Sequence, residues 1–190
     1  MDKKLLLKSH FHFVGIGGIG MSALAIGLLK KGCSVSGSDL VKNDETKKLE
    51  ELGAVIFSSQ IRQNIEFVIS KFSNKLINFV VSSAIKPENE EFSYCREKNL
   101  SIKHRSEILA MLMQTYTALA VAGSHGKTST STFLSTILEL CTSNSSSITG
   151  GIIPIYNSNC HLENTKYLVA EVDESDGTTV SYTHLRAHET

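Results

Sequence analysis

One stretch of this chain constrains its fold more than any other: a short apolar run that leads through a glycine-framed turn into a helix. The run is Leu119–Ala122, and the turn is Gly123-Ser-His-Gly-Lys-Thr-Ser129. Apolar residues then recur at helical spacing, namely Phe133, Leu134, Ile137, Leu138 and Cys141. Such a turn leaves the first N–H groups of the helix unpaired in front of the positive end of its dipole, which favours an anion. The pattern therefore predicts a buried strand, a phosphate-binding loop and a helix.

The residue types in this loop suit a nucleotide phosphate. Gly123 and Gly126 let the backbone approach the anion, and Lys127 adds a mobile positive charge for the outer phosphates. Thr128 offers a hydroxyl of the kind that binds magnesium in such loops. The common motif has four residues between its glycines, but this loop is G-x-x-G-K-T, with Val121 where the first glycine would stand. On these residues alone, a helix start with an incidental Gly-Lys-Thr stays open as an alternative.

A second glycine-rich turn lies near the N-terminus. The strand Phe11–Val14 runs into Gly15, Gly17 and Gly20 at G-x-G-x-x-G spacing, and a helix with one apolar face follows, closed by Gly32. The next strand, Cys33–Ser36, ends near Asp39, close to where a dinucleotide fold places its ribose-binding acid. By spacing alone, NAD(P) and another nucleotide or phosphate ligand are about equally supported, and tight packing without a ligand is a lesser alternative.

Helices and strands continue to alternate up to Met113. The expected elements are a helix ending at Leu52, a strand Ala54–Phe57, a polar helical stretch, a strand Ile77–Val81, a solvated helix Glu88–Lys98, an edge strand Ser101–Lys103 and a helix Ser106–Met113 with Ile108, Leu109, Leu112 and Met113 facing inward. This alternation predicts a parallel sheet.

Three residues at the ends of these strands are ligand candidates. In open parallel sheets the ligand lies beyond the carboxyl ends of the strands, so Ser82 and Ser83 could face the same ligand as Gly15. They could equally begin a turn towards Pro87. Arg105 stands at a strand–helix junction, where a cation could meet a phosphate or be solvated.

The second strand–loop–helix unit predicts a domain boundary near residues 113–117, giving domains of residues 1–113 and 114–177. Beyond its helix we expect a polar connection at 143–147 and a turn at Gly150-Gly151. The strand Tyr167–Glu171 then runs into further carboxylates at Asp173, Glu174 and Asp176. A solvated acidic turn is the usual explanation of such a run. Because Glu171 and Asp173 alternate along a strand expected beside the phosphate loop, a magnesium site there is the alternative.

The amino-acid composition limits the kinds of partner that this chain is expected to bind. Nineteen basic and nineteen acidic residues cancel, and no basic stripe with interleaved aromatic residues is present, which disfavours nucleic acid and membrane surfaces. No apolar run matches a signal peptide or a membrane span, so we expect a cytoplasmic protein. The four cysteines are widely separated and lack metal-ligand spacing, so we expect reduced thiols.

Taken together, five stretches closely resemble the Mur ligases of peptidoglycan synthesis. They are Phe13-Val-Gly-Ile-Gly-Gly-Ile-Gly-Met-Ser22, Ser36-Gly-Ser-Asp39, Val81-Ser-Ser-Ala-Ile85, Gly123-Ser-His-Gly-Lys-Thr-Ser129 and Glu171-Val-Asp-Glu-Ser-Asp176. The resemblance covers roughly residues 10 to 177 in the right order. The family's loop is G-[ST]-x-G-K-[ST], which accounts for the short spacing here. In this family the first glycine-rich domain holds a UDP-sugar, so an NAD(P)-dependent oxidoreductase becomes the alternative.

The resemblance implies a fold and a reaction. The chain would be α/β, with a Rossmann-like parallel-sheet N-terminal domain followed by a truncated P-loop-type ATP-binding domain. The full-length enzyme would use ATP and Mg²⁺ to join L-alanine to the lactyl carboxylate of UDP-N-acetylmuramate through an acyl phosphate. Lys127 would stabilise charge on the transferring phosphoryl group.

The resemblance also implies where each ligand binds. UDP-N-acetylmuramate would lie against Gly15, Ile16, Gly17, Gly18, Ile19, Gly20, Met21, Asp39, Ser82, Ser83, Ala84 and Arg105. ATP would lie against Gly123, Ser124, His125, Gly126, Lys127, Thr128 and Ser129. Thr128 and Glu171 would hold magnesium.

Two departures from the family pattern carry expectations of their own. Residues 67–76 make a longer connection than is usual in the family, which suggests a surface insertion. Residues 178–190 do not continue the family pattern, and we expect them to be a non-native tail. Members of this class run to more than twice this length, so the 190-residue chain is expected to be inactive alone.

Overall fold

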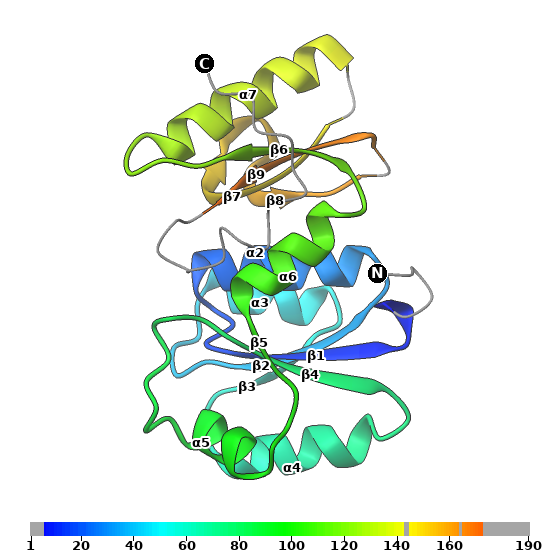
Figure 1. Ribbon diagram of the computed structural model, residues 1–190, viewed down its shortest axis with the longest axis vertical. Coiled ribbons are helices and arrows are strands. Elements are labelled where there is room, and N and C mark those ends of the chain that lie inside the picture. The colour runs from blue at the N-terminus through cyan, green and yellow to red at the C-terminus, as the bar shows by residue number, and fades with distance from the viewer. Residues whose placement is uncertain (1–5, 143–144, 164, 173–190) are drawn as a thin grey trace. The chain divides into compact units, whose positions relative to one another are not determined.

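The computed structural model describes residues 6–142, 145–163 and 165–172 of the chain (Figure 1). The chain divides into two compact units between Arg105 and Ser106. The boundary predicted from the sequence lies at residue 113, eight residues later. The helix between the two positions, α6 (Arg105–Met113), buries the four apolar residues expected to face inward, which are Ile108, Leu109, Leu112 and Met113.

The first unit, residues 1–105, contains a five-stranded parallel sheet. Its strands are β1 (Ser9–Val14), β2 (Ser34–Ser38), β3 (Val55–Phe57), β4 (Leu76–Val81) and β5 (Ile102–His104). Their order is β3-β2-β1-β4-β5, and every neighbouring pair is parallel. The strand order therefore reverses at β1, as in doubly wound folds, and the predicted Rossmann-like parallel sheet is confirmed.

Helices cover both faces of this sheet (Figure 1). On one face lie α2 (Ile19–Lys30) and α3 (Asp44–Glu51), and on the other lie α4 (Arg62–Lys71) and α5 (Glu90–Glu97). Local sequence sets the start of α3, because the Asn43 side chain accepts the Thr46 N–H at 2.9 Å and the Thr46 hydroxyl accepts the Asn43 N–H at 3.0 Å. Large apolar side chains of the strands form the core of this unit, and those of Phe11 and Phe13 are fully buried.

Two sequence expectations about this unit need revision. Residues 67–76 are largely exposed, as a surface segment would be, but Val68 is a fully buried member of the core beneath α4, and Phe72 packs against the same core. The α5 segment is not simply solvated either, because Glu91 and Cys95 are buried. In α5 the buried face holds Glu91 and Cys95 at i, i+4 spacing, and because one of them is a carboxylate the sequence does not reveal this face.

The second unit contains a mixed four-stranded sheet. Its strands are β6 (Thr117–Val121), β7 (Ser146–Ile153), β8 (Ser158–His161) and β9 (Tyr167–Glu171), in the order β6-β9-β7-β8. The pairs β6–β9 and β9–β7 are parallel, and β7–β8 is antiparallel. The helix α7 (Lys127–Thr142) follows the glycine-framed loop, and a 3₁₀ turn, η1 (Pro154–Tyr156), joins β7 to β8. Because β6 and β9 are parallel neighbours, the glycine-framed loop after β6 and Glu171, the last residue of β9, lie at the same edge of this sheet.

Two expectations about the second unit are also wrong, and α7 buries a face that the sequence did not indicate. The strand β6 is an edge strand with no fully buried residue, not a buried one. Gly150-Gly151 lies inside β7 rather than in a turn. The apolar residues of α7 do not form its buried face, since Phe133 is 68% and Ile137 57% exposed, whereas Ser131 and Ser135 are fully buried.

The described helices include none that is both long and apolar enough to cross a lipid bilayer. The predicted tail at 178–190 lies outside the described residues.

Candidate functional site

The first glycine-rich loop connects β1 to α2 and is tied to the end of β2. The N–H groups of Gly15 and Ile16 both donate to the Ser38 carbonyl oxygen, at 2.8 and 3.0 Å. Gly15 has φ +78°, a conformation that favours glycine. The N-cap residue of α2, Gly18, offers no side-chain acceptor to the first turn of the helix. The N-terminus of α2 therefore has no side-chain cap, and an uncapped helix N-terminus favours a phosphate.

The structure brings Asp39 onto this loop, as the sequence predicts. Its Oδ2 accepts the Gly17 N–H at 2.8 Å, and the Asn43 side chain donates to the Gly17 carbonyl at 3.0 Å. A Cβ atom on Gly17 would lie 2.8 Å from Asp39 Oδ2. Only glycine fits at position 17 without moving the carboxylate.

The other predicted residues of the first unit gather at the same end of the sheet. Ile85, which follows Ser82–Ala84, comes within 3.2 Å of the Cβ position of Gly15, and the Arg105 guanidinium within 2.9 Å of that of Gly20. The Ser83 hydroxyl bonds the His104 Nε2 at 3.1 Å. Sequence reasoning missed His104, although its place just before Arg105 at the end of β5 could have indicated it.

Not every predicted residue can contribute its side chain. Ile16 and Met21 are buried, so they can offer only backbone to a ligand in this arrangement. Gly18 and Ile19 are exposed, with Ile19 55% accessible.

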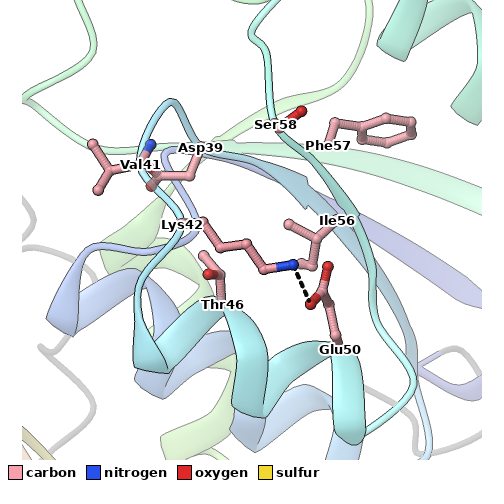
Figure 2. A pocket seen from close by; sticks show the side chains of 8 residues that line it. All are labelled: Asp39, Val41, Lys42, Thr46, Glu50, Ile56, Phe57 and Ser58. Carbon is pink, nitrogen blue, oxygen red and sulfur yellow. Dashed lines mark hydrogen bonds and ion pairs between the residues drawn. The ribbon is translucent and has the colours of Figure 1, made fainter.

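A cavity of about 180 Å³ lies beside Asp39, between α3 and the ends of β2 and β3 (Figure 2). Its wall combines the Asp39 carboxylate with apolar side chains and an ion pair between Lys42 and Glu50 at 3.3 Å. The full lining is Asp39, Val41, Lys42, Thr46, Glu50, Ile56, Phe57 and Ser58. Such a mixture of polar and apolar side chains beside the glycine-rich loop is of the kind that lines small-molecule sites.

A buried polar network supports the end of β2 from the opposite face of the sheet. Glu91 of α5 is fully buried, and its carboxylate accepts the Ser38 hydroxyl and, at 2.7 Å, the Asn64 side-chain amide. His12 Nε2 lies 3.7 Å from the same carboxylate. The network continues through the Ser36 hydroxyl, which bonds both His12 and His10 at 2.8 Å. It holds the residue whose carbonyl anchors the glycine-rich loop, and no sequence motif indicated it.

Within this network His10 is kept uncharged. Burial, together with the charges of His12, Lys75 and Lys71, lowers the pKa of His10 to about 3. Its ring nitrogens bond the Ser34 and Ser36 hydroxyls, and its ring stacks on Phe72 with 3.6 Å between centroids.

The second loop has the backbone that its sequence predicts. Gly123 and Gly126 have φ of +148° and +74°, where a side chain would strain the chain. α7 begins at Lys127, whose Nζ donates to the Gly123 carbonyl at 2.8 Å. Ser124, His125, Thr128 and Ser129 are exposed around the start of this helix.

The structure also brings Thr128 and Glu171 together. The Thr128 hydroxyl lies 3.1 Å from each carboxylate oxygen of Glu171, so it can donate to one of them, and the Gly150 N–H donates to Oε2 at 2.8 Å. Among the residues that the structure describes, no cluster of three or more His, Cys, Asp and Glu side chains could hold a metal. A hydroxyl and a carboxylate are nevertheless hard oxygen ligands of the kind that magnesium takes, so the pair fits that ion. Asp173, Glu174 and Asp176 lie outside the described residues.

Fold and loops together define an α/β protein with two strand–loop–helix units of the nucleotide-binding kind. Comparison with family models agrees: residues 10–117 match the Mur ligase family, catalytic domain. The chain belongs to the Mur ligase family, as its motifs predict.

Individual relatives extend the match. A UDP-N-acetylmuramate–L-alanine ligase of Prochlorococcus marinus subsp. pastoris is 71% identical over 182 residues, which are 96% of this chain and 38% of the relative. The crystal structure of a UDP-N-acetylmuramate-alanine ligase from Thermotoga maritima superposes with a TM-score of 0.74 at 28% identity, covering 87% of this chain and 37% of that one. The chain thus spans little more than a third of the length of these relatives. They give no support to the NAD(P)-dependent alternative.

Proposed function

We propose that this chain is the nucleotide-binding part of an ATP-dependent ligase that joins L-alanine to the lactyl carboxylate of UDP-N-acetylmuramate. The observation that carries the proposal is the 71% identity to a relative named for that reaction. The presence of two separate glycine loops supports it, since the reaction needs one site for a UDP-sugar and another for ATP. An oxidoreductase would leave the second loop without a role.

In the first unit, the UDP-sugar would lie along Gly15–Met21, with its diphosphate at the N-terminus of α2. The Gly17 N–H now bonds Asp39. A phosphate that took this N–H would release the carboxylate to accept a ribose hydroxyl, which is the role of the acid at this position in related folds. The cavity beside Asp39 is adjacent and would be open to the nucleoside (Figure 2). Arg105, near Gly20, would add positive charge, and Ser82–Ala84 would close the other side of the loop.

In the second unit, ATP would lie against Gly123–Ser129. Lys127 would leave the Gly123 carbonyl and turn its Nζ to the outer phosphates. Thr128 and Glu171 would hold magnesium, with waters and phosphate oxygens completing about six ligands. When bound, the ion neutralises charge on the phosphates.

The reaction would proceed in two steps. The carboxylate of UDP-N-acetylmuramate takes the γ-phosphoryl group of ATP, which gives an acyl phosphate and ADP. The amine of L-alanine then attacks the acyl carbon, phosphate leaves, and the amine loses a proton to give the amide. Lys127 would contribute by stabilising charge during phosphoryl transfer rather than by a covalent step.

Calorimetric titration of the 190-residue chain tests the proposal. We expect UDP-N-acetylmuramate to bind, ATP to bind with magnesium, and NADH not to bind. Lys127→Ala should lose ATP binding and keep UDP-sugar binding, because the two ligands occupy different units. Tight NADH binding without UDP-sugar binding would instead favour an oxidoreductase.

A turnover assay tests the second part of the proposal. The relatives are more than twice as long, and an acyl phosphate must be shielded from water until the amine arrives. We therefore expect no amide product from the 190 residues alone. Measured amide formation by the purified chain would contradict this.

A further inference from the structure

Gly150 and Gly151 lie beside the Thr128–Glu171 pair. β7 pairs with β9 as far as Ile148, opposite Ala170, and its pairing with β8 shifts register between Ile148 and Ile153. Both glycines therefore fall in the irregular part of the strand. There the Gly150 N–H donates to the Glu171 carboxylate at 2.8 Å. The strand thus directs a backbone donor at a side chain of the candidate metal site.

These glycines supply space rather than an unusual backbone. A Cβ atom on Gly150 would lie 3.2 Å from both carboxylate oxygens of Glu171, and one on Gly151 would lie 2.9 Å from the Thr128 methyl carbon. The glycines with positive φ in the described chain are Gly15, Gly32, Gly53, Gly123 and Gly126, so neither Gly150 nor Gly151 needs glycine for its conformation. What matters at both positions is the missing side chain.

We propose that Gly150 and Gly151 are positioning residues for the metal-binding pair. The Gly150 N–H orients the Glu171 carboxylate, and Gly151 leaves room for the Thr128 side chain. This inference rests on the proposed ATP and magnesium site. A hydrogen bond to an ionised carboxylate is stronger than a neutral one, and outer partners that orient metal ligands are typically worth about 10- to 100-fold in metal affinity.

Gly150→Ala and Gly151→Ala test the proposal when ATP binding is measured by calorimetry over a range of Mg²⁺ concentrations. Each substitution should raise the Mg²⁺ concentration needed for half-maximal ATP binding by about tenfold or more. ATP binding without magnesium should not change. A merely structural role would weaken ATP binding equally with and without the ion.

A rescue experiment distinguishes the two glycines. Thr128→Ser keeps the hydroxyl and removes the methyl group that the added methyl of Gly151→Ala would meet. The double variant Gly151→Ala/Thr128→Ser should therefore recover most of the original Mg²⁺ dependence, whereas Gly150→Ala/Thr128→Ser should not, because its contact is with Glu171. Failure of the first rescue would overturn the role assigned to Gly151.

Gly53→Ala is the matched control. Gly53 has φ +95° and no atom within 4 Å of its Cβ position, so alanine strains the backbone of the first unit without touching this site. Its Mg²⁺ dependence should equal that of the unaltered chain. If the unaltered chain shows no magnesium-dependent ATP binding, the proposed function of the second unit and this inference both fail. If it binds and both single alanine variants keep its Mg²⁺ dependence, only the inference fails.

Discussion

The two strand–loop–helix units of this chain share the same order of apolar run, glycine loop and helix, but their helices are buried differently. In α2 every residue from Met21 to Leu28 is buried. In α7 the buried positions are Ser131 and Ser135, while Phe133 and Ile137 face outward. Both helices follow a glycine loop, and both show apolar residues at helical spacing. Apolar periodicity therefore indicates a helix, but which face is buried depends on the layers around it.

The loops also differ in what supports them. The first loop donates two N–H groups to the Ser38 carbonyl, and the Ser38 hydroxyl donates to the fully buried carboxylate of Glu91. The second is braced by the Thr128–Glu171 pair, which is accessible to solvent. A buried network resists rearrangement, because each broken hydrogen bond leaves an unpaired group. We expect the first loop to be the more rigid of the two.

The largest expected effect tests the burial difference directly. Leu24→Ala in α2 should lower the free energy of unfolding by about 2–5 kcal/mol, since it empties space around a side chain that is 3% exposed. Ile137→Ala in α7 should cost within about 0.5 kcal/mol, as at other exposed positions. Urea unfolding of both variants gives the comparison. Equal losses would show that the outer face of α7 is covered in solution.

The next effect concerns the first loop. Gly17→Val should weaken UDP-N-acetylmuramate binding by about a hundredfold or more, roughly 2.7 kcal/mol, because its side chain would displace Asp39 and block the approach of backbone to phosphate. Gly18→Ala, whose Cβ would meet nothing closer than 3.6 Å, should lose less. Calorimetry measures both. Magnesium-dependent ATP binding should be unaffected by either variant, and a parallel loss would mean that the units do not bind independently.

Acid should weaken the buried network of the first unit. The pKa of His10 is about 3 in the folded chain and about 6.5 when the residue is free, so the unfolded chain takes up the proton first. Stability from this group is complete above about pH 6.5 and is lost as the pH falls towards 3. Between pH 6.5 and 5 the loss should be about 2 kcal/mol.

Urea unfolding at pH 7 and at pH 5 measures this loss. His10→Gln should show a smaller pH dependence, because it removes the titrating group. Among the described residues of the second unit no histidine is fully buried, so that unit lacks an equivalent. An unchanged pH dependence in His10→Gln would assign the acid sensitivity to other groups.

The smallest effect belongs to the metal pair. Glu171→Gln should weaken magnesium-dependent ATP binding by about tenfold, roughly 1.4 kcal/mol, because water can replace part of what the carboxylate supplies. Thr128→Val should act in the same direction. UDP-sugar affinity should remain nearly unchanged in both. Normal ATP binding by Glu171→Gln at limiting magnesium would show that this carboxylate does not hold the ion and only belongs to a solvated turn.

Local patterns were sufficient for the helices and strands of the first unit and for most of the candidate site, but not for β7 and β8 of the second unit. The alternation of helices and strands predicted a parallel sheet, and the topology rule for such sheets placed Asp39 and Ser82–Ala84 at the end where the structure has them. The burial of Val68 and Glu91 could not be predicted in this way. Val68 stands between Phe67 and Ile69, so the sequence does not show which of the three packs inward, and Glu91 belongs to a residue type that is seldom buried. Only the packing of α4 and α5 against the sheet buries Val68 and Glu91.

The sequence by itself determined the two glycine loops, because positive φ at Gly15, Gly123 and Gly126 is a local requirement that residue type reveals. It also determined family membership, since the motifs occur in order. Only the tertiary structure decided which groups meet: Glu171 with Thr128 and Gly150, Glu91 with Ser38, and the serine face of α7 turned inward. These are contacts between residues far apart in the chain. They depend on strand order and helix rotation, which no short stretch of sequence encodes.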